Sequence, residues 1–236
     1  MPEKLRVRLA ELKNLYFDGF AFRSYSQEGE DMILRRIFEG SGGPGFYVDI
    51  GAHHPKRFSN TYYFYLQGWR GINVDAMPGS MELFKRFRPR DINLEIPVSD
   101  THETLVYYAF EEPALNSFSK ELAETYINKN FRLKFTRNLE TSTLAEILDQ
   151  HLPPGQKIDF LSVDVEGLDL KVLQSNNWQK YQPRFILVEV LSTAFTRLPE
   201  TDVAVFLKQH GYEPHAKCEN TVFFKRLVQD ASHQRP

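Results

Sequence analysis

Short apolar runs alternate with amphipathic segments along most of this chain. The runs are rich in β-branched and aromatic residues, which is typical of parallel strands that are buried on both faces. They cover residues 46–50, 71–74, 91–97, 158–163 and 184–188. The segments between these runs include predicted helices at 62–67, 143–150 and 203–210. Strands that alternate with helices predict a doubly wound, mainly parallel α/β sheet.

The two ends of the chain and one internal stretch depart from this alternation. Residues 212–218 and 221–226 predict a closing hairpin, which adds an antiparallel C-terminal strand to the sheet. The least regular stretch is 113–140, apart from a predicted helix at 119–128. We expect it to be either a lid over a substrate or a plain connection. Residues 3–16 predict an amphipathic surface helix.

Composition narrows the class of protein. Of the 236 residues, 42% are hydrophobic and 25% are charged, which is ordinary for a soluble globular domain. A formal net charge of −2 gives no reason to expect nucleic acid or an anionic membrane as a partner. No apolar run is long enough to span a bilayer, and the N-terminus lacks the apolar core of a secretion signal. Cys218 is the single cysteine, so no internal disulfide can form, and we expect a cytoplasmic protein.

Acidic residues stand at the carboxyl ends of four predicted strands, namely Asp49, Asp75, Asp164 and Glu189. The carboxyl ends of parallel strands meet at one edge of a sheet, where open α/β folds bind ligands. Asp75 lies 24 residues after Gly51, close to the roughly 20-residue spacing at which a nucleotide-binding unit places an acid for ribose hydroxyls. Gly51 would let the chain pass close to a ligand. These strand ends therefore predict an adenosine site.

The sequence of the turn after the first strand indicates which adenosine-containing cofactor the site would bind. It reads Asp-Ile-Gly-Ala-His-His over residues 49–54, with one of the three glycines that let a dinucleotide-binding turn approach a pyrophosphate. An acid before a single glycine suits a cofactor whose amino-acid portion carries an ammonium group. S-adenosylmethionine is therefore the predicted cofactor. The alternatives are a nicotinamide-dependent oxidoreductase on a related fold and a non-catalytic adenosine- or sugar-binding module.

Several motifs together resemble the FkbM-type methyltransferase family. They occupy residues 26–31, 47–55, 59–61, 68–75, 88–94, 114–118 and 158–170. The resemblance implies a class I methyltransferase fold, which is Rossmann-like, and the transfer of a methyl group from S-adenosylmethionine to a hydroxyl oxygen. Substrates in the family are often sugars, glycans or glycosylated natural products, so we expect a small-molecule or glycan acceptor with a hydroxyl. One departure is Ala76-Met77, where a proline- or asparagine-bearing segment is expected beside the adenosine.

The family motifs also suggest how the chain is divided. Residues 24–228 are expected to form the methyltransferase domain, behind a helical extension over residues 1–23. Residues 229–236 are expected to form a disordered tail.

Cofactor contacts are predicted from the strand ends and the matched motifs. The methionine part of the cofactor is expected among Asp49, Gly51, Ala52 and His53, helped by Ser59 or Asn60 and by Gln27. Asp75 is expected to bind the ribose hydroxyls, with Ala76 beside it. Ser99 or Asp100, beyond the third strand, is expected near the adenine.

Methyl transfer needs a group that takes the proton of a weakly nucleophilic hydroxyl. Asp164 is the leading candidate base, because it follows the fourth strand, where the acceptor should meet the methyl group. Glu189 could join Asp164 around a hard divalent ion such as Mg2+, with Glu166 as a third acid. His53 is a second candidate base, since imidazole titrates near neutral pH. The alternative is that Asp164 and Glu189 bind loop N–H groups and hold the crevice open.

Overall fold

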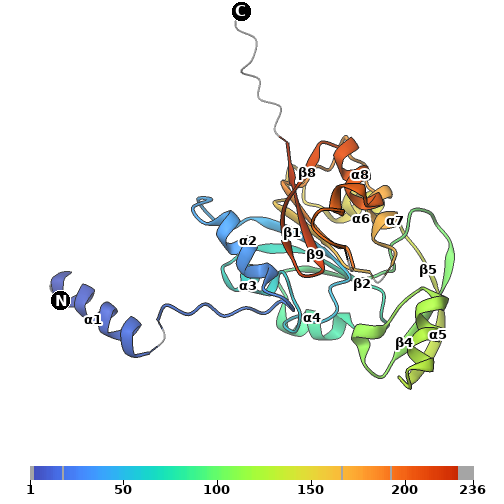
Figure 1. Cartoon of the computed structure of the whole chain (residues 1–236), viewed down its shortest axis with the longest axis horizontal. Coiled ribbons are helices and arrows are strands. Elements are labelled where there is room, and N and C mark those ends of the chain that lie inside the picture. The colour runs from blue at the N-terminus through green and yellow to red at the C-terminus, as the bar shows by residue number, and fades with distance from the viewer. Residues whose placement is uncertain (1–2, 18, 166, 192, 228–236) are drawn as a thin grey trace, which may run out of the picture.

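A sheet of seven strands forms the centre of the computed structural model (Figure 1). The structure describes residues 3–17, 19–165, 167–191 and 193–227. The strands of the sheet are β1 (Phe46–Ile50), β2 (Arg70–Asp75), β3 (Ile92–Glu95), β6 (Phe160–Val163), β7 (Phe185–Glu189), β8 (Tyr212–Cys218) and β9 (Thr221–Arg226). Their order is β3-β2-β1-β6-β7-β9-β8. The first five are parallel, and β9 runs antiparallel to β7 and β8. This confirms the predicted fold class, including the closing hairpin.

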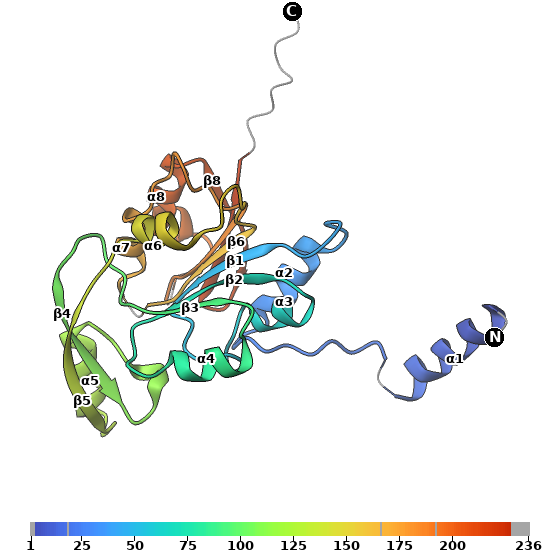
Figure 2. The same ribbon diagram turned by 180° about the vertical axis from the view of Figure 1, so that it is seen from behind.

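Helices cover both faces of the sheet (Figure 2). One face carries α2 (Glu30–Phe38) and α3 (Tyr62–Leu66), and the other carries α6 (Leu144–His151), α7 (Asp169–Gln174) and α8 (Asp202–Gln209). A further helix, α4 (Met81–Phe87), lies beside β3. Side chains alternate between the faces along each strand. Tyr47 accordingly packs with the core under α2 and α3, whereas Val48 packs with the core under α6, α7 and α8.

The chain changes direction across the sheet at β1. From β1 it moves outward through β2 to β3, then returns to the opposite side of β1 and continues through β6 to β7. The connections that follow β1 and β6 therefore leave in opposite directions. Open α/β sheets bind ligands at such a switch point, outside the carboxyl ends of the strands.

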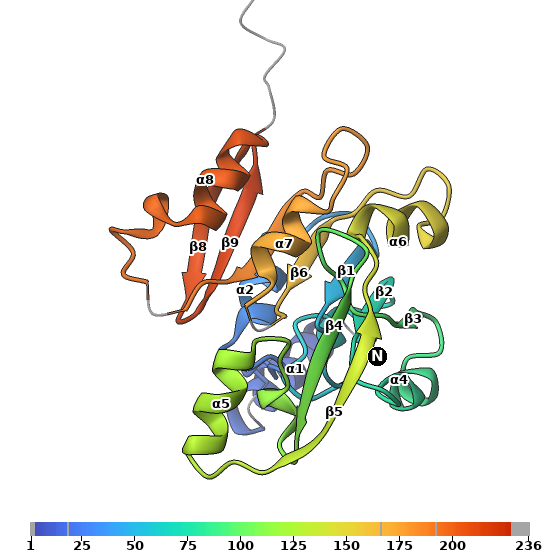
Figure 3. The ribbon, with the colours of Figure 1, turned by 90° about the vertical axis from the view of Figure 1, so that its right-hand side faces the viewer.

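Residues 104–140 form a second, smaller unit beside the main sheet (Figure 3). β4 (Thr104–Phe110) pairs antiparallel with β5 (Leu133–Glu140), and η1 (Pro113–Leu115) and α5 (Lys120–Asn128) connect them. The predicted helix is confirmed, but the description of 113–140 as irregular was wrong, because β5 was missed. Apolar and polar residues do alternate over Leu133–Glu140, with Arg137 as the exception on the apolar face, so a two-residue period was present in the sequence.

The N-terminal helix α1 (Glu3–Tyr16) confirms the predicted helix but buries none of its residues. It stands apart from the sheet in Figures 1 and 2. Among the described residues, no helix is long and apolar enough to cross a membrane. The predicted tail over residues 229–236 lies outside the described residues.

A buried ion pair joins the turn after α4 to the first two strands. Arg88 and Asp91 are both buried, and the distance from Arg88 Nε to Asp91 Oδ2 is 2.8 Å. Arg88 also donates hydrogen bonds to the hydroxyls of Tyr47 (2.6 Å) and Thr61 (2.9 Å). Asp91 accepts the backbone N–H of Gly71 at 3.0 Å. Segments far apart in the sequence therefore meet at one guanidinium and one carboxylate.

Replacing Arg88 should destabilise the protein strongly, because Asp91 would keep a buried charge without its cation. We expect Arg88→Met to lower the free energy of unfolding by about 3–5 kcal/mol, measured by urea denaturation. Arg86→Met is the matched control, because Arg86 is exposed on the neighbouring helix and should change stability by less than about 0.5 kcal/mol. Equal losses in the two variants would show that the ion pair does not stabilise the fold.

Candidate active site

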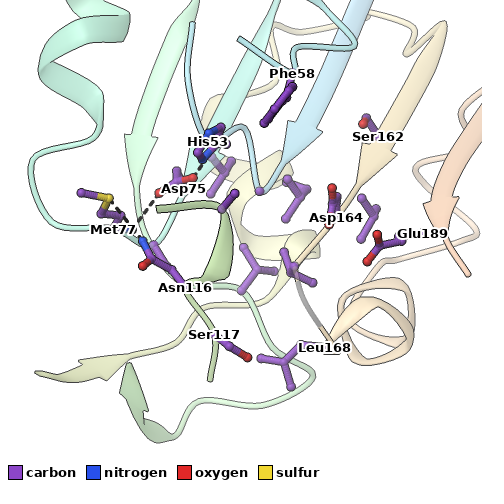
Figure 4. A pocket seen from close by; sticks show the side chains of 18 of the residues that line it. His53, Phe58, Asp75, Met77, Asn116, Ser117, Ser162, Asp164, Leu168 and Glu189 are labelled. Atoms are coloured by element: carbon purple, nitrogen blue, oxygen red, sulfur yellow. Dashed lines mark hydrogen bonds between the residues drawn. The ribbon is translucent and has the colours of Figure 1, made fainter. Parts of the chain in front are cut away.

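A cavity of about 340 Å³ lies over the carboxyl ends of β1, β2, β6 and β7 (Figure 4). Its volume falls in the range of sites that bind small molecules. The sheet supplies one wall, and the segment 113–118 of the smaller unit supplies another. The cavity therefore occupies the switch point that the strand order predicts.

Eight of the predicted site residues line this cavity. They are Gln27, Gly51, His53, Asn60, Asp75, Ala76, Asp164 and Glu189. The structure does not bring five others to the cavity wall, namely Asp49, Ala52, Ser59, Ser99 and Asp100. Glu166, the third predicted acid, lies outside the described residues.

Asp49 misses the cavity because of strand alternation. Its side chain points to the face covered by α3 and accepts a hydrogen bond from the Thr61 hydroxyl at 2.8 Å. Burial raises the pKa of this carboxyl. Ser59 is buried on the same face, where its hydroxyl accepts the backbone N–H of Tyr62 at 3.1 Å. Ala52 packs against α4 instead. Asp49, Ser59 and Ala52 therefore support the turn after β1 by packing outside the cavity.

Ser99 and Asp100 lie beyond the cavity for a different reason. The Ser99 hydroxyl donates to Asp100 and to Glu103, both at 3.1 Å. Asp100 also lies 3.6 Å from the Lys171 ammonium group. Both side chains are thus engaged in a polar cluster near α7, whereas Ile96, Pro97 and Val98 line the cavity after β3.

Asp75 is fixed at one side of the cavity by the backbone. One carboxylate oxygen accepts the N–H of His53 and the other accepts the N–H of Met77, each at 2.8 Å. Burial raises the pKa of this carboxyl, and the two backbone hydrogen bonds oppose that shift. Each oxygen of a carboxylate can accept more than one hydrogen bond. Asp75 is therefore held in one orientation and can still accept from two vicinal hydroxyls.

Asp164 and Glu189 lie beside each other at the opposite side of the cavity (Figure 4). Asp164 is open to the cavity, yet the surrounding protein atoms reduce its hydration, and this desolvation raises the pKa of its carboxyl well above the ordinary value. The negative charge of Glu189 raises it further. A ligand that displaced water from the cavity would strengthen both effects.

The predicted Mg2+ site receives no support from the donor set. The described residues contain no group of three or more His, Cys, Asp or Glu side chains that could hold a metal ion. In the described parts of the chain, Asp164 and Glu189 are therefore not joined by a third His, Cys, Asp or Glu side chain in a metal-binding group, and we assign no step to a metal.

His53 lies beside Asp75 rather than beside Asp164 (Figure 4). Burial and the nearby Arg57 lower the pKa of its imidazole, so the ring is neutral at physiological pH. The ring stacks on Phe58 with a centroid distance of 6.1 Å. Its backbone has a left-handed φ of 53°, which directs the N–H to Asp75.

Sequence reasoning named no site residue in two parts of the cavity wall. The first is the segment of the smaller unit that contributes Tyr107, Asn116, Ser117 and Phe118. Residues 114–118 match a family motif, and 113–140 was expected to be a lid or a connection, but none of these side chains was singled out. The second part joins opposite ends of the chain. Glu28 accepts the backbone N–H of Asn220 (3.0 Å), and Glu30 accepts the hydroxyl of Thr221 (3.2 Å). No local pattern reveals contacts across such a separation.

Gly51 is required by a close approach of the backbone. Its φ is +85°, and a Cβ atom at this position would lie 1.7 Å from the carbonyl oxygen of Asp164. The sequence predicted that Gly51 leaves space for a ligand. The structure shows that it leaves space for the loop after β6, which carries Asp164 into the cavity.

The parallel sheet, the single-glycine turn and the acid after β2 together define a class I methyltransferase-type α/β protein. The model of the methyltransferase FkbM domain matches residues 49–214, which is more than half of the chain. The chain belongs to the FkbM methyltransferase family, a family of S-adenosylmethionine-dependent methyltransferases. This confirms the resemblance found in the sequence motifs.

The solved structures that are similar to this chain include two methyltransferases. One is methyltransferase FkbM from Methylobacillus flagellatus KT, with 12% identity, coverage of 90% of this chain and 47% of that chain, and a TM-score of 0.43. The other is Burkholderia thailandensis 1,6-didemethyltoxoflavin-N1-methyltransferase, with bound 1,6-didemethyltoxoflavin and S-adenosylhomocysteine. It has 14% identity, coverage of 97% of this chain and 91% of that chain, and a TM-score of 0.43. Comparison with curated proteins gives no match.

Gly51→Ala should separate backbone strain from steric collision. Gly79 is the matched control, because its φ of +84° is nearly identical and no atom lies within 4 Å of the place of its Cβ. Both variants should lose about 1–2 kcal/mol from the left-handed backbone. Gly51→Ala should lose about 1–3 kcal/mol more, because the loop that carries Asp164 must move. Urea denaturation measures both losses, and equal values would contradict the steric explanation.

Proposed function

We propose that this protein transfers a methyl group from S-adenosylmethionine to a hydroxyl of a sugar, a glycan or a glycosylated natural product. Family membership supports methyl transfer. The observation that carries the proposal is the placement of Asp75 and Asp164 at opposite sides of one cavity (Figure 4). We also propose that residues 24–228 form the methyltransferase domain. The cytoplasmic location and the absence of a nucleic-acid partner stay predictions.

The residues present fit S-adenosylmethionine. Asp75, oriented by two backbone N–H groups, would accept hydrogen bonds from the ribose hydroxyls. Gly51 and Asn60 line the adjoining part of the cavity and would bind the methionine portion together with Gln27. Ala76 would lie against the adenosine. S-adenosylmethionine supplies a methyl group bonded to a positively charged sulfur, which is left as a neutral thioether.

Asp164 would take the proton of the acceptor hydroxyl while the oxygen forms its new bond to the methyl carbon. A raised carboxyl pKa makes Asp164 a stronger base than an ordinary aspartate once it is ionised. Glu189 would contribute by raising that pKa and by orienting the acceptor. His53 is neutral and could accept a proton, but it lies beside Asp75 (Figure 4), where we propose the ribose. We therefore favour Asp164 as the base.

Aromatic side chains support an acceptor with a sugar ring. Phe58, Tyr107 and Phe118 line the cavity, and their flat apolar faces can pack against the C–H face of a pyranose. Family membership favours methyl transfer over the nicotinamide-dependent alternative. A non-catalytic binding module would take up S-adenosylmethionine without releasing S-adenosylhomocysteine in the presence of any acceptor.

Asp75→Asn should weaken cofactor binding, because the amide would lose the charge and one of the two acceptor oxygens. We expect the affinity for S-adenosylhomocysteine to fall about 10- to 100-fold, as a hydrogen bond to a charged group contributes about 1.5–3 kcal/mol. Isothermal calorimetry measures this change. Asp100→Asn is the control, since Asp100 lies off the cavity, and its affinity should stay within about twofold. Unchanged affinity in Asp75→Asn would remove the ribose role.

Asp164→Asn should abolish the base without removing the cofactor site. We expect kcat to fall by about 10²- to 10⁴-fold, while the affinity for S-adenosylhomocysteine is retained. In the parent protein, kcat/KM should fall as the pH drops through the pKa of Asp164, because the protonated carboxyl cannot accept a proton. An ordinary aspartate has a pKa of about 3.9. Because the pKa of Asp164 is raised well above that value, the decline should occur at a higher pH than for an ordinary aspartate.

Glu189→Gln provides a second measurement on the same base. Removing the neighbouring negative charge should lower the pKa of Asp164, so the acid decline of kcat/KM should move to lower pH. Full turnover of Asp164→Asn with cofactor bound, or an acid decline that does not respond to Glu189→Gln, would contradict the assignment of Asp164 as the base.

A further inference from the structure

Acidic side chains line the cavity without lysine or arginine among its described residues. Five carboxylate side chains line it, from Glu28, Glu30, Asp75, Asp164 and Glu189. No lysine or arginine is present among the described residues that line it. An ordinary surface mixes both signs of charge, so this asymmetry concerns the ligands that the cavity admits.

Nearby cations are engaged elsewhere. Arg57 lies near His53, and its guanidinium is 3.1 Å from the carboxylate of Glu112. Arg88 lies beneath the turn after β1 and is paired with Asp91. Neither side chain lines the cavity. A phosphate group in the cavity would therefore face carboxylates without a cationic partner, and like charges at close range are strongly unfavourable.

The carboxylates are divided between the two sides of the cavity. Asp75 stands alone on the side proposed for the ribose. Asp164 and Glu189 follow neighbouring strands on the other side, and Glu30 at the start of α2 is close enough to Asp164 to repel its charge. Glu30 is 4% exposed, and its carboxylate is oriented by the Thr221 hydroxyl and the Glu28 N–H.

Asp164 is positioned to contact a ligand in the cavity. Its carboxylate is directed into the cavity (Figure 4), and no described residue donates a hydrogen bond to it. S-adenosylmethionine carries one net positive charge, from its sulfonium and ammonium groups less its carboxylate. The acids on this side therefore exceed the positive charge that the cofactor brings.

We infer that the acceptor carries a protonated amine beside the hydroxyl that is methylated, as an amino sugar or an amino-glycoside does, and that phosphorylated or nucleotide-linked sugars are rejected. The inference rests on the proposed function and names the acceptor class of the same site. The ammonium group binds Glu189 and Glu30 and keeps its proton. The hydroxyl faces Asp164, which receives the hydroxyl proton when the oxygen takes the methyl group.

Binding to the S-adenosylhomocysteine-loaded protein tests this charge preference. Four probes share one ring: glucosamine, glucose, N-acetylglucosamine and glucose 6-phosphate. Calorimetry should show glucosamine binding at least about tenfold more tightly than glucose or N-acetylglucosamine, in line with the net contribution of a charged hydrogen bond. Glucose 6-phosphate should not bind. The advantage of glucosamine should shrink as salt rises, since screening weakens charge recognition.

Two variants test whether Glu189 and Glu30 are the carboxylates that recognise the ammonium group. Glu189→Gln and Glu30→Gln should each reduce the preference for glucosamine over glucose by about fivefold or more. Glu111→Gln is the control, because Glu111 does not line the cavity, and its preference should match that of the parent protein. Thermal unfolding of each variant confirms that the fold is retained, and Glu189→Gln alone decides the outcome if Glu30→Gln does not fold.

The outcomes separate the two proposals. Equal binding of glucosamine and glucose, binding of the phosphorylated probe, or no binding of glucosamine would overturn the inference and leave methyl transfer intact. Methylation assays with labelled S-adenosylmethionine and oligosaccharides of amino sugars test the reaction itself. Uptake of cofactor without transfer to any hydroxyl, or a methyl group located on nitrogen by mass spectrometry, would overturn the proposed function.

Discussion

The buried ion pair between Arg88 and Asp91 is the interaction on which the geometry of the cavity depends. Taking two charges out of water is costly, and it is offset only where further hydrogen bonds complete both groups. Here the Thr61 hydroxyl links Arg88 to Asp49: it accepts from the Arg88 guanidinium at 2.9 Å and donates to one carboxylate oxygen of Asp49 at 2.8 Å. Thr61 follows Asn60, whose amide donates to Ser162 at 3.1 Å. The hydrogen bonds that join Arg88, Thr61 and Asp49 below the cavity thus help to position Asn60, which lines its wall.

The acids above this network are arranged at an electrostatic cost. The charges of Glu189 and Glu30 disfavour ionisation of Asp164, and the protein atoms around Asp164 reduce its hydration. A positively charged ligand would offset this cost, because its charge replaces water as the partner of the carboxylates. Affinity for such a ligand and instability without it therefore have the same electrostatic origin, and binding should raise the stability of the protein. This relation links the raised pKa of Asp164 to its proposed chemistry.

Reasoning from strand ends located the site but not every residue in it. Asp75, Asp164 and Glu189 lie at the carboxyl ends of β2, β6 and β7, which are on the two sides of β1, and all three side chains reach one cavity. Asp49 was grouped with them, yet it lies within β1 rather than after it, and alternation turns its side chain toward α3. Gly51 was correctly singled out, but its partner is the backbone of Asp164. A one-residue difference in position along a strand thus decides which face of the sheet a side chain joins.

The sequence by itself determined the layered α/β architecture, the edge of the sheet that holds the site and the family, because hydrophobic period and local motifs are properties of short segments. Only the tertiary structure decided that the 113–118 segment and the 218–221 turn complete the cavity wall. It also decided that the cavity gathers carboxylates without lysine or arginine in its described lining. These features depend on contacts between segments as far apart as Glu28 and Asn220, and electrostatic potential sums over groups that are close in space whatever their separation in the chain.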